Sequence, residues 1–406
     1  MVDKKSNLPL PHLSFIINLL LPKRLVGLER TKRQFQTLKE LCSKDSSLSD
    51  GFFNPILVGS SAEGYNIPDG ISRSNPFKVE TNADADVLFE ITALKVLVNE
   101  KDSESIPEKE IKCVLDYNES HPGYGKVRFQ KEPKEADDTF IFVPEEDKYF
   151  LSGSKLQAKC FSNASSHVQN IELHGPAIST SSAMEKTMLE ILESGKSGDK
   201  PQLHNHDYVL SLPCIGWPEI AKPWIERQQK QTWINAQMLK AVTENGIHLV
   251  AVPHRLSEHP NLDWRISFAT TEVYLAHNVI TDEQRQCYVF LKIINVQVLK
   301  KFDLLTSYHL KTIFLYSCEK LPPQAWVENI AACLLFMIDM LIDSLKKKVI
   351  PNFFVPENNM IDYFSEDQLK QCIEVLESVR ERPLQPVLEF TDDRALGLQS
   401  FSTPFR

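Results

Sequence analysis

Strand-type and helix-type patterns occupy different parts of this 406-residue sequence, and this segregation constrains the fold more than any other feature. Short apolar or β-branched runs bounded by Gly, Pro, Asn and Ser are typical of strands. They lie at residues 55–58, 86–92, 111–117, 139–143 and 207–212. From about Trp224 onward the apolar spacing is helical. The sequence therefore predicts an α+β protein with two lobes, a mixed β-sheet N-lobe and a helical C-lobe with a wide crevice between them.

The expected domains follow this division. Residues 1–220 are predicted to form the sheet lobe with a long N-terminal helix, residues 221–390 the helical lobe, and residues 391–406 a C-terminal tail. Helices are expected at 185–195, 281–301, 306–319, 324–348 and 366–381. Thr281 and Gln284 have the spacing of a capping box, which predicts where the second of these helices begins.

Charge is distributed unevenly along the chain. The formal net charge is −9, which excludes a uniformly basic protein that coats nucleic acid. The first 42 residues nevertheless carry eight Lys or Arg and three acidic residues, a net charge of +5. A helical row of cations could contact phosphates, or it could simply be a solvated helix face. The candidates for nucleic-acid binding are Arg24, Arg30, Lys32, Arg33 and Lys39.

The eight cysteines are scattered, without a CxxC pair or a Cys/His cluster at zinc spacing. This favours reduced thiols and a cytoplasmic protein. The longest apolar runs are well short of the ~20 residues that a bilayer requires, so no membrane span is expected.

Acidic residues at two strand starts give the most specific chemical signal. Gly59 and Ser60 end one predicted strand, and Asp84 and Asp86 begin another. Residues i and i+2 of a strand point to the same face, roughly 6.6 Å apart, so these two carboxylates can converge. Asp207 opens a further strand and is the best candidate for a third carboxylate.

Three such acids suit phosphoryl transfer with two divalent ions, Mg²⁺ or Mn²⁺, which stabilise the attacking and leaving oxygens. One carboxylate can also accept the proton of the attacking hydroxyl. A DxD pair alone is more often a turn or a solvated strand end, and Gly-Ser at a strand end is usually a turn. The combination of all three features favours a metal site.

Several motifs together resemble one family in order and spacing. They are GSSAEG (59–64), DADVLFEI (84–91), HGPA (174–177), DYVLSLPCIGWP (207–218), WRISF (264–268) and SYHLKT (307–312). This set is similar to the cyclic GMP-AMP synthase-like receptors of the male-abnormal (Mab) nucleotidyltransferase superfamily, over about residues 50–360. The resemblance implies a bilobed nucleotidyltransferase fold and an enzyme that joins ATP and/or GTP into a cyclic dinucleotide.

The resemblance also implies roles for individual residues. By position, Asp84, Asp86 and Asp207 match the metal ligands, with Asp207 as the base. The nucleotide-binding positions are Gly59, Ser60, Arg265, Ser267, Glu272, Lys292, Ser307 and Tyr308. Among these, Lys292 and Ser307 match donors to the triphosphate, and Tyr308 matches an aromatic ring that stacks on a base. Without the resemblance, Lys292 and Lys311 would be read as solvent-facing helix lysines, and Tyr308 as a core aromatic residue.

Two departures from the family pattern bear on function. The mammalian DNA sensor carries a zinc-binding Cys/His insertion after its WR(L/I)SF motif, whereas residues 276–287 contain one His and one Cys. Ala269 also replaces a serine expected near the base. The missing zinc-binding insertion argues against DNA sensing. Double-stranded RNA is therefore favoured over DNA as the activator in innate immune signalling. A non-catalytic binding member, or an enzyme making linear oligonucleotides, remains an alternative, and the sequence leaves the oligomeric state open.

Overall fold

The computed structural model describes residues 10–20, 53–67, 70–71, 79–80, 85–99, 111–132, 142–145, 147–167, 171–174, 177–180, 206–231, 233–244 and 246–386. The expected helix at 185–195, the five N-terminal basic candidates and the predicted tail lie outside these residues, as does Asp84.

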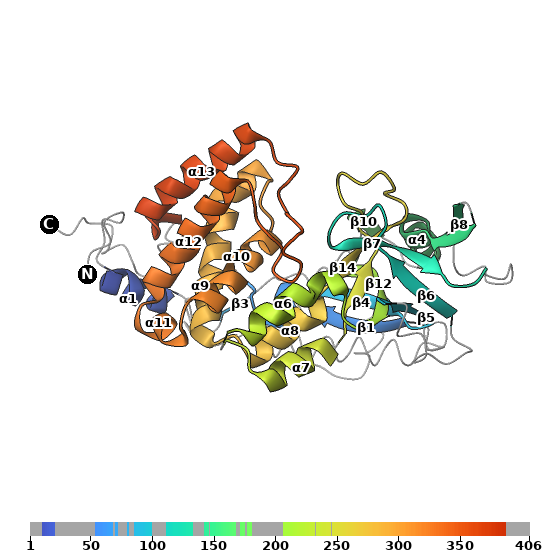
Figure 1. Ribbon diagram of the computed structural model, residues 1–406. Coiled ribbons are helices and arrows are strands. Elements are labelled where there is room, and N and C mark those ends of the chain that lie inside the picture. Colours follow the sequence, from blue (N-terminus) through green and yellow to red (C-terminus); the bar gives the residue numbers. More distant parts are fainter. Residues whose placement is uncertain are drawn as a thin grey trace, which may run out of the picture.

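Most strands of the described residues belong to one sheet, which fills one end of the molecule (Figure 1). Its twelve strands are β1 (Phe53–Val58), β4 (Ala85–Ile91), β5 (Leu94–Leu97), β6 (Ile111–Asp116), β7 (Tyr124–Phe129), β8 (Phe142–Glu145), β9 (Lys148–Leu151), β10 (Ile171–His174), β11 (Ala177–Thr180), β12 (His206–Ile215), β13 (His248–Val250) and β14 (Asp263–Ser267). The short strands β2 (Gly70–Ile71) and β3 (Val79–Glu80) pair only with each other.

Strand β12 is the centre of this sheet. Its first half pairs parallel with β4, its C-terminal end pairs parallel with β5, and β11 and β13 pair antiparallel along its other edge. The pairings then continue through β14, β7 and β6 back to β5, so this part of the sheet closes on itself. The strand that carries Asp207 is thereby fixed from both sides.

Most helices form the other end of the molecule, with α6, α7 and α8 lying between them and the sheet, whereas α4 lies at the sheet end (Figure 1). The α-helices are α1 (Leu10–Leu20), α3 (Gly59–Glu63), α4 (Gly153–His167), α6 (Lys222–Gln229), α7 (Ala236–Glu244), α8 (Ala269–Asn278), α9 (Asp282–Ile294), α10 (Ser307–Lys320), α11 (Pro323–Glu328), α12 (Ile330–Lys347) and α13 (Glu366–Glu381). Short helical turns cover Glu219–Ala221, Asn295–Leu299 and Lys300–Phe302.

The helical lobe is held by a large apolar core. Tyr288 of α9 and Phe314 of α10 stack with ring centroids 4.7 Å apart, and both side chains are fully buried. Helix α1, far away in sequence, packs on this lobe, where the Ser14 hydroxyl donates to the Asn329 side chain over 3.2 Å. Ala269 and Val273 of α8 pack on an apolar face of the sheet.

The predicted bilobed α+β fold is confirmed, and the capping box of Thr281 and Gln284 begins α9 as expected. Two local predictions are wrong. The region after Trp224 is not wholly helical, because β13 and β14 continue the sheet. These strands have three and five residues, and apolar runs of that length do not distinguish a strand from a buried helix segment. The division at residue 220 stays a prediction.

The helix expected at 324–348 is in fact two helices, α11 and α12, which are separated at Asn329. The Asn329 side chain accepts a hydrogen bond from the Ala332 amide over 3.2 Å and so caps α12. Asparagine is among the preferred residues at that position, which explains the break.

Candidate active site

Two of the three predicted metal ligands are brought together by strand register. Asp86 of β4 and Asp207 of β12 are directly opposed across the parallel pairing. Opposed residues on neighbouring strands point to the same face, and the strands lie about 4.8 Å apart. Both residues are partly exposed. Asp84, two residues before Asp86 in the sequence, lies outside the described residues.

Gly59 brings the predicted nucleotide turn against this pair. Val58, the last residue of β1, pairs with Asp86, and Gly59 follows with φ +70°. A Cβ atom at Gly59 would lie 1.9 Å from Oδ2 of Asp86. Glycine is required here for two reasons, since a side chain would strain the left-handed backbone and would also collide with the carboxylate.

Ser60 and Lys292 meet at the start of α3. The Lys292 ammonium donates to Oγ of Ser60 over 2.9 Å and to the carbonyl of Tyr65 over 2.7 Å. Burial, together with the nearby Lys311 ammonium, lowers the pKa of Lys292 to about 8, against the opposing effect of Glu63 and Asp86. The predicted alternative, a solvent-facing lysine, is therefore wrong for Lys292.

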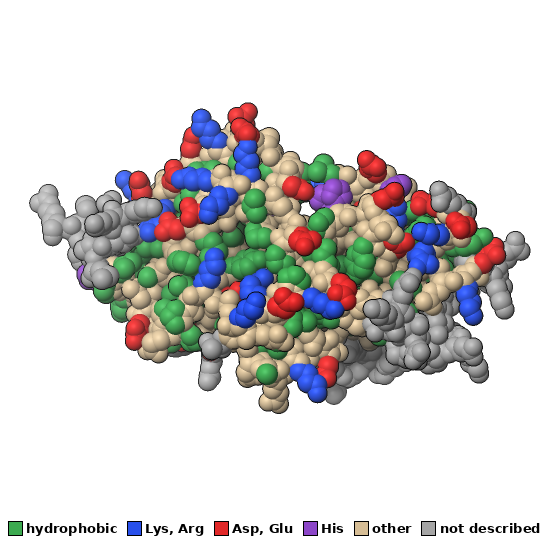
Figure 2. Space-filling view, viewed as in Figure 1, with side chains coloured by type: hydrophobic (Ala, Val, Ile, Leu, Met, Phe, Trp, Pro, Cys, Tyr) green, Lys and Arg blue, Asp and Glu red, His purple; other side chains and the backbone are tan. Residues whose placement is uncertain are grey.

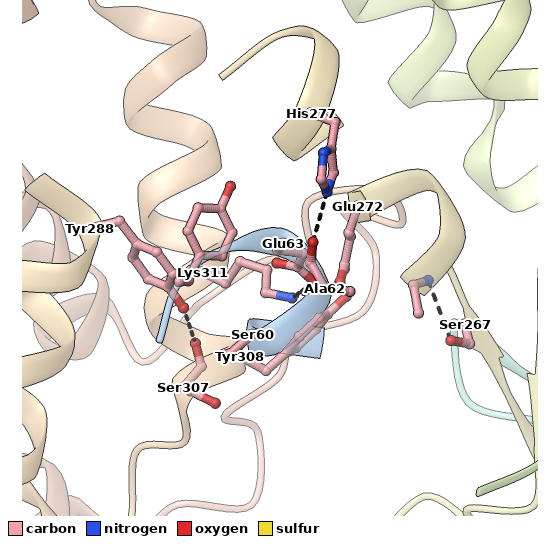
Figure 3. A network of polar contacts seen from close by, with 12 residues as sticks. Ser60, Ala62, Glu63, Ser267, Glu272, His277, Tyr288, Ser307, Tyr308 and Lys311 are labelled. Carbon is pink, nitrogen blue, oxygen red and sulfur yellow. Dashed lines mark hydrogen bonds and ion pairs between the residues drawn. The ribbon is translucent and has the colours of Figure 1, made fainter. Parts of the chain in front are cut away.

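The C-terminal end of α3 is held by cationic or hydrogen-bonding side chains of the helical region. Nε2 of His277 lies 2.7 Å from the Ala62 carbonyl oxygen (Figure 3). The Arg285 guanidinium donates to the Glu63 carbonyl over 2.6 Å and to the Ala276 carbonyl over 2.7 Å. His277 and Arg285 thus satisfy carbonyls that the end of α3 leaves without intrahelical partners, and Lys292 binds the Tyr65 carbonyl just beyond the helix.

A buried ion triad adjoins the turn. The Lys311 ammonium donates to Oε1 of Glu63 over 2.7 Å and to Oε2 of Glu272 over 2.8 Å (Figure 3). Burial alone would lower the pKa of Lys311, but the Glu272 and Glu63 carboxylates outweigh it and raise the pKa well above its ordinary value. Burial raises the pKa of Glu63, because its charged form loses water. Lys311 is 7% exposed, so it too is not a solvent-facing lysine.

Ser307 and Tyr308 lie at the beginning of α10, near the Lys311 side chain (Figure 3). The Tyr288 hydroxyl donates to the Ser307 carbonyl over 3.0 Å. This contact uses the backbone of Ser307 and not its side chain, and the residue is exposed. The Tyr308 ring is half-buried and lies 5.6 Å from the Lys311 ammonium. Its hydroxyl accepts from the Asn352 amide over 3.3 Å, and burial raises its pKa.

The remaining predicted nucleotide residues come from β14 and α8. Arg265 is exposed, and Oγ of Ser267 accepts from the Ala269 amide over 3.4 Å. Glu272 is 6% exposed and engaged by Lys311, so its carboxylate is committed to the triad. The sequence reasoning did not assign Glu63, Lys311 or Arg285 to the site. The signal for the first two was available, since both are part of the motifs GSSAEG and SYHLKT.

A separate cluster has metal-ligating residue types. Among the described residues, His121, His254 and Asp362 have potential ligand atoms within 4.8 Å of one another. The two imidazole rings stack at 3.8 Å, so their nitrogen lone pairs do not converge on one point. Nδ1 of His254 also accepts from the Leu256 amide over 3.2 Å. Both histidines are thus engaged by the Leu256 backbone, and the cluster is distinct from the predicted carboxylate site.

A surface that binds nucleic acid is expected to carry a basic patch. On the face drawn in Figure 2, Lys and Arg side chains are interspersed with Asp and Glu side chains. The five predicted contacts, Arg24, Arg30, Lys32, Arg33 and Lys39, lie outside the described residues and stay predictions.

Of the helices that the structure describes, none is long and apolar enough to cross a membrane.

The fold and the site define a protein of the nucleotidyltransferase class, and comparison with known sequences specifies the family. Residues 89–278 match the Mab-21 protein nucleotidyltransferase domain, and residues 283–378 match the Mab-21 protein HhH/H2TH-like domain. The chain belongs to the Mab-21 nucleotidyltransferase superfamily, and its relatives include cyclic GMP-AMP synthase-like proteins.

Three curated relatives illustrate the similarity. Protein mab-21-like 3 of Danio rerio is 22% identical over 208 residues, which are 48% of this chain and 51% of the relative. Cyclic GMP-AMP synthase-like receptor 2 of Drosophila melanogaster is 32% identical over 114 residues, 28% of this chain and 24% of the relative. Cyclic GMP-AMP synthase of Mus musculus is 24% identical over 199 residues, 43% of this chain and 38% of the relative. The matches thus span between about a quarter and half of each relative's length.

Proposed function

We propose that the protein is a nucleotidyltransferase that makes a cyclic dinucleotide from ATP and/or GTP. The observation that carries this proposal is the register of Asp86 opposite Asp207, with Gly59, which precedes Ser60, directly against Asp86. Two of the relatives bear names that refer to cyclic GMP-AMP synthesis, and this supports the same product class here.

The carboxylate pair suits two divalent ions, Mg²⁺ or Mn²⁺. Asp86 and Asp207 offer hard oxygen donors, which these ions prefer, and the missing side chain of Gly59 leaves the space that the Asp86 carboxylate occupies. Asp84 is proposed as the third ligand, on sequence alone. When bound, the ions supply charge stabilisation for the attacking and leaving oxygens of the phosphoryl transfer.

The chain's own groups hold the substrate and move one proton. The Lys292 ammonium donates to Ser60 and Tyr65, so its third hydrogen and the Ser60 hydroxyl hydrogen are available to triphosphate oxygens. Ser307 is proposed to donate to the same triphosphate. The attacking ribose hydroxyl gives its proton to Asp207 while its oxygen bonds to the α-phosphorus and the bond to pyrophosphate breaks.

The base-binding end is proposed to lie along α10 and β14. Tyr308 would stack on a nucleobase, a contact worth ~1–3 kcal/mol per base where it occurs. Arg265, Ser267 and Glu272 would line the same crevice. A second transfer on the linear product would close the ring. For the trigger we propose double-stranded RNA, bound through the basic N-terminal segment, in innate immune signalling within the cytoplasm.

Product analysis tests this proposal. Purified protein is incubated with Mg²⁺ or Mn²⁺ and labelled ATP and GTP, with duplex RNA, with duplex DNA, or without nucleic acid. We expect a phosphatase-resistant dinucleotide, and duplex RNA should increase it. Phosphatase-sensitive ladders would indicate linear synthesis, and the absence of product under all conditions would contradict an enzymatic function.

A further inference from the structure

Helix α3, which begins with the Gly59-Ser60 turn, has five residues. A helix of this length has too few hydrogen bonds to be stable alone, so contacts with other elements must set its position. Besides the contacts to its carbonyl groups and the Lys292 hydrogen bond to Ser60, another side chain of α3 is held by an ion pair. That side chain is Glu63, which is completely buried and receives a hydrogen bond from Lys311 of α10.

The spacing of these residues connects both ends of the proposed nucleotide site. Glu63 follows Ser60 by three residues on α3, and Lys311 follows Tyr308 by three residues on α10. Residues three apart lie on the same side of a helix. The ion pair therefore joins the turn carrying Ser60 to the helix turn carrying the Tyr308 ring, and the Lys311 ammonium lies 5.6 Å from that ring.

A purely stabilising role explains this arrangement poorly. The triad places two carboxylates and one ammonium out of water, and apolar residues of similar size often stabilise a core at least as well. Among the described residues, Oε2 of Glu63 also has no hydrogen-bond partner, which adds to the cost of burial. What a directional ion pair provides in return is a fixed register between the two elements.

We propose that Glu63 and Lys311 are positioning residues that hold the Ser60 turn at a fixed distance and angle from Tyr308. This inference rests on the proposed function, in which the triphosphate of a nucleotide lies at Ser60 and a base lies on Tyr308. Glu272 holds the other side of the Lys311 ammonium, so the same cation is also tied to α8.

The test uses the full chain with Glu63→Gln, Lys311→Met and the double variant. Lys320→Met, an exposed lysine on the same helix, is the matched control. Glu63→Gln keeps the size and the acceptor oxygen but removes the charge that attracts Lys311. We expect the KM for ATP to rise about tenfold and kcat to change less than threefold, because the strands that carry Asp86 and Asp207 are not altered. If a substitution only reduced the fraction of protein that is folded, apparent kcat would fall and the KM for ATP would stay unchanged.

The double variant tests whether the two residues act as one unit. We expect its KM to match that of the single variants, whereas multiplied effects would contradict a shared role. Hydrogen exchange of the amides of residues 59–65 provides a readout independent of turnover, and it should accelerate at least fivefold in Glu63→Gln but not in Lys320→Met. If exchange and KM both stayed within twofold of wild type, the positioning role would be wrong. A wild type that forms no product would instead overturn the proposed function, while the exchange measurement would still decide the positioning of the turn.

Discussion

At the scale of single residues, Gly59 occupies the position in the site where a side chain is least tolerated. Its backbone is left-handed, and a Cβ atom would lie 1.9 Å from Oδ2 of Asp86. Gly246 offers a matched comparison, because its φ is +73° but the nearest atom to an added Cβ is 3.5 Å away. The two glycines thus separate backbone strain from displacement of the carboxylate.

We predict that Gly59→Ala reduces kcat about 100-fold and that Gly246→Ala changes it less than threefold. Both substitutions should cost about 1 kcal/mol or more in the free energy of unfolding, since each places alanine in the left-handed region. Turnover and urea unfolding of the two variants provide the measurement. Equal losses of kcat in both would mean that strain alone, and not the Asp86 contact, explains the effect.

Lys292 predicts a pH dependence of nucleotide binding. Its pKa is lowered to about 8, so the free protein carries the ammonium below pH 8 and loses it above. The γ-phosphate, with a second pKa of about 6, is already fully charged there. The KM for ATP should therefore rise above pH 8, by up to tenfold per pH unit. Steady-state kinetics from pH 6.5 to 9.5 measure this, and a KM that stays flat across that range would contradict the assignment.

At the scale of elements, helix starts show what local sequence can and cannot reveal. The capping box of Thr281 and Gln284 was predicted from spacing and is confirmed at α9, the helix that carries Lys292. An equivalent box, Ser365 with Gln368, begins α13. Both depend on neighbours three residues away, which a sequence displays directly.

We predict that Thr281→Ala and Ser365→Ala each lower the free energy of unfolding by about 1 kcal/mol, because each removes the acceptor for an amide at a helix start. Urea unfolding monitored by circular dichroism measures both. A loss below 0.3 kcal/mol in either variant would show that the cap contributes little there.

The pairing of elements was harder to predict than their existence. The runs beginning at Asp86 and Asp207 were identified as strands, but their register depends on contacts more than 100 residues apart in sequence. For the same reason the partner of Lys311 was not predicted, since Glu63 lies 248 residues away. Strands β13 and β14 were missed because their pairing with β12 and β7, rather than their own pattern, determines their conformation.

At the scale of the whole molecule, the two-lobed α+β architecture followed from the separation of strand-type and helix-type patterns, and the structure confirms it. The helical lobe contributes Lys292, Ser307, Tyr308 and Lys311 to a site whose acids come from the sheet. A trigger that moves the lobes relative to each other would therefore act on the site directly. The basic segment before residue 42 is the proposed place for such a trigger.

We predict that Lys32→Glu combined with Arg33→Glu abolishes activation by duplex RNA and leaves the fold intact, because phosphate contacts are replaced by repulsion. Wild-type activation should also weaken steeply between 50 and 200 mM salt. Product formation as a function of RNA and salt concentration measures both effects. Unchanged activation of the double variant would remove this segment as the binding site.

Asp86 and Asp207 are proposed to act together as the catalytic carboxylates, and turnover of Asp86→Asn and Asp207→Asn tests this most directly. Each substitution keeps the size of the side chain but removes the charge. Asp303→Asn is the control, because Asp303 is exposed and asparagine tolerates the left-handed backbone conformation at that position. We expect product formation to fall at least 1,000-fold in each site variant, with unchanged thermal unfolding, and to stay at the wild-type level in the control. Wild-type turnover in either Asp86→Asn or Asp207→Asn would contradict the account.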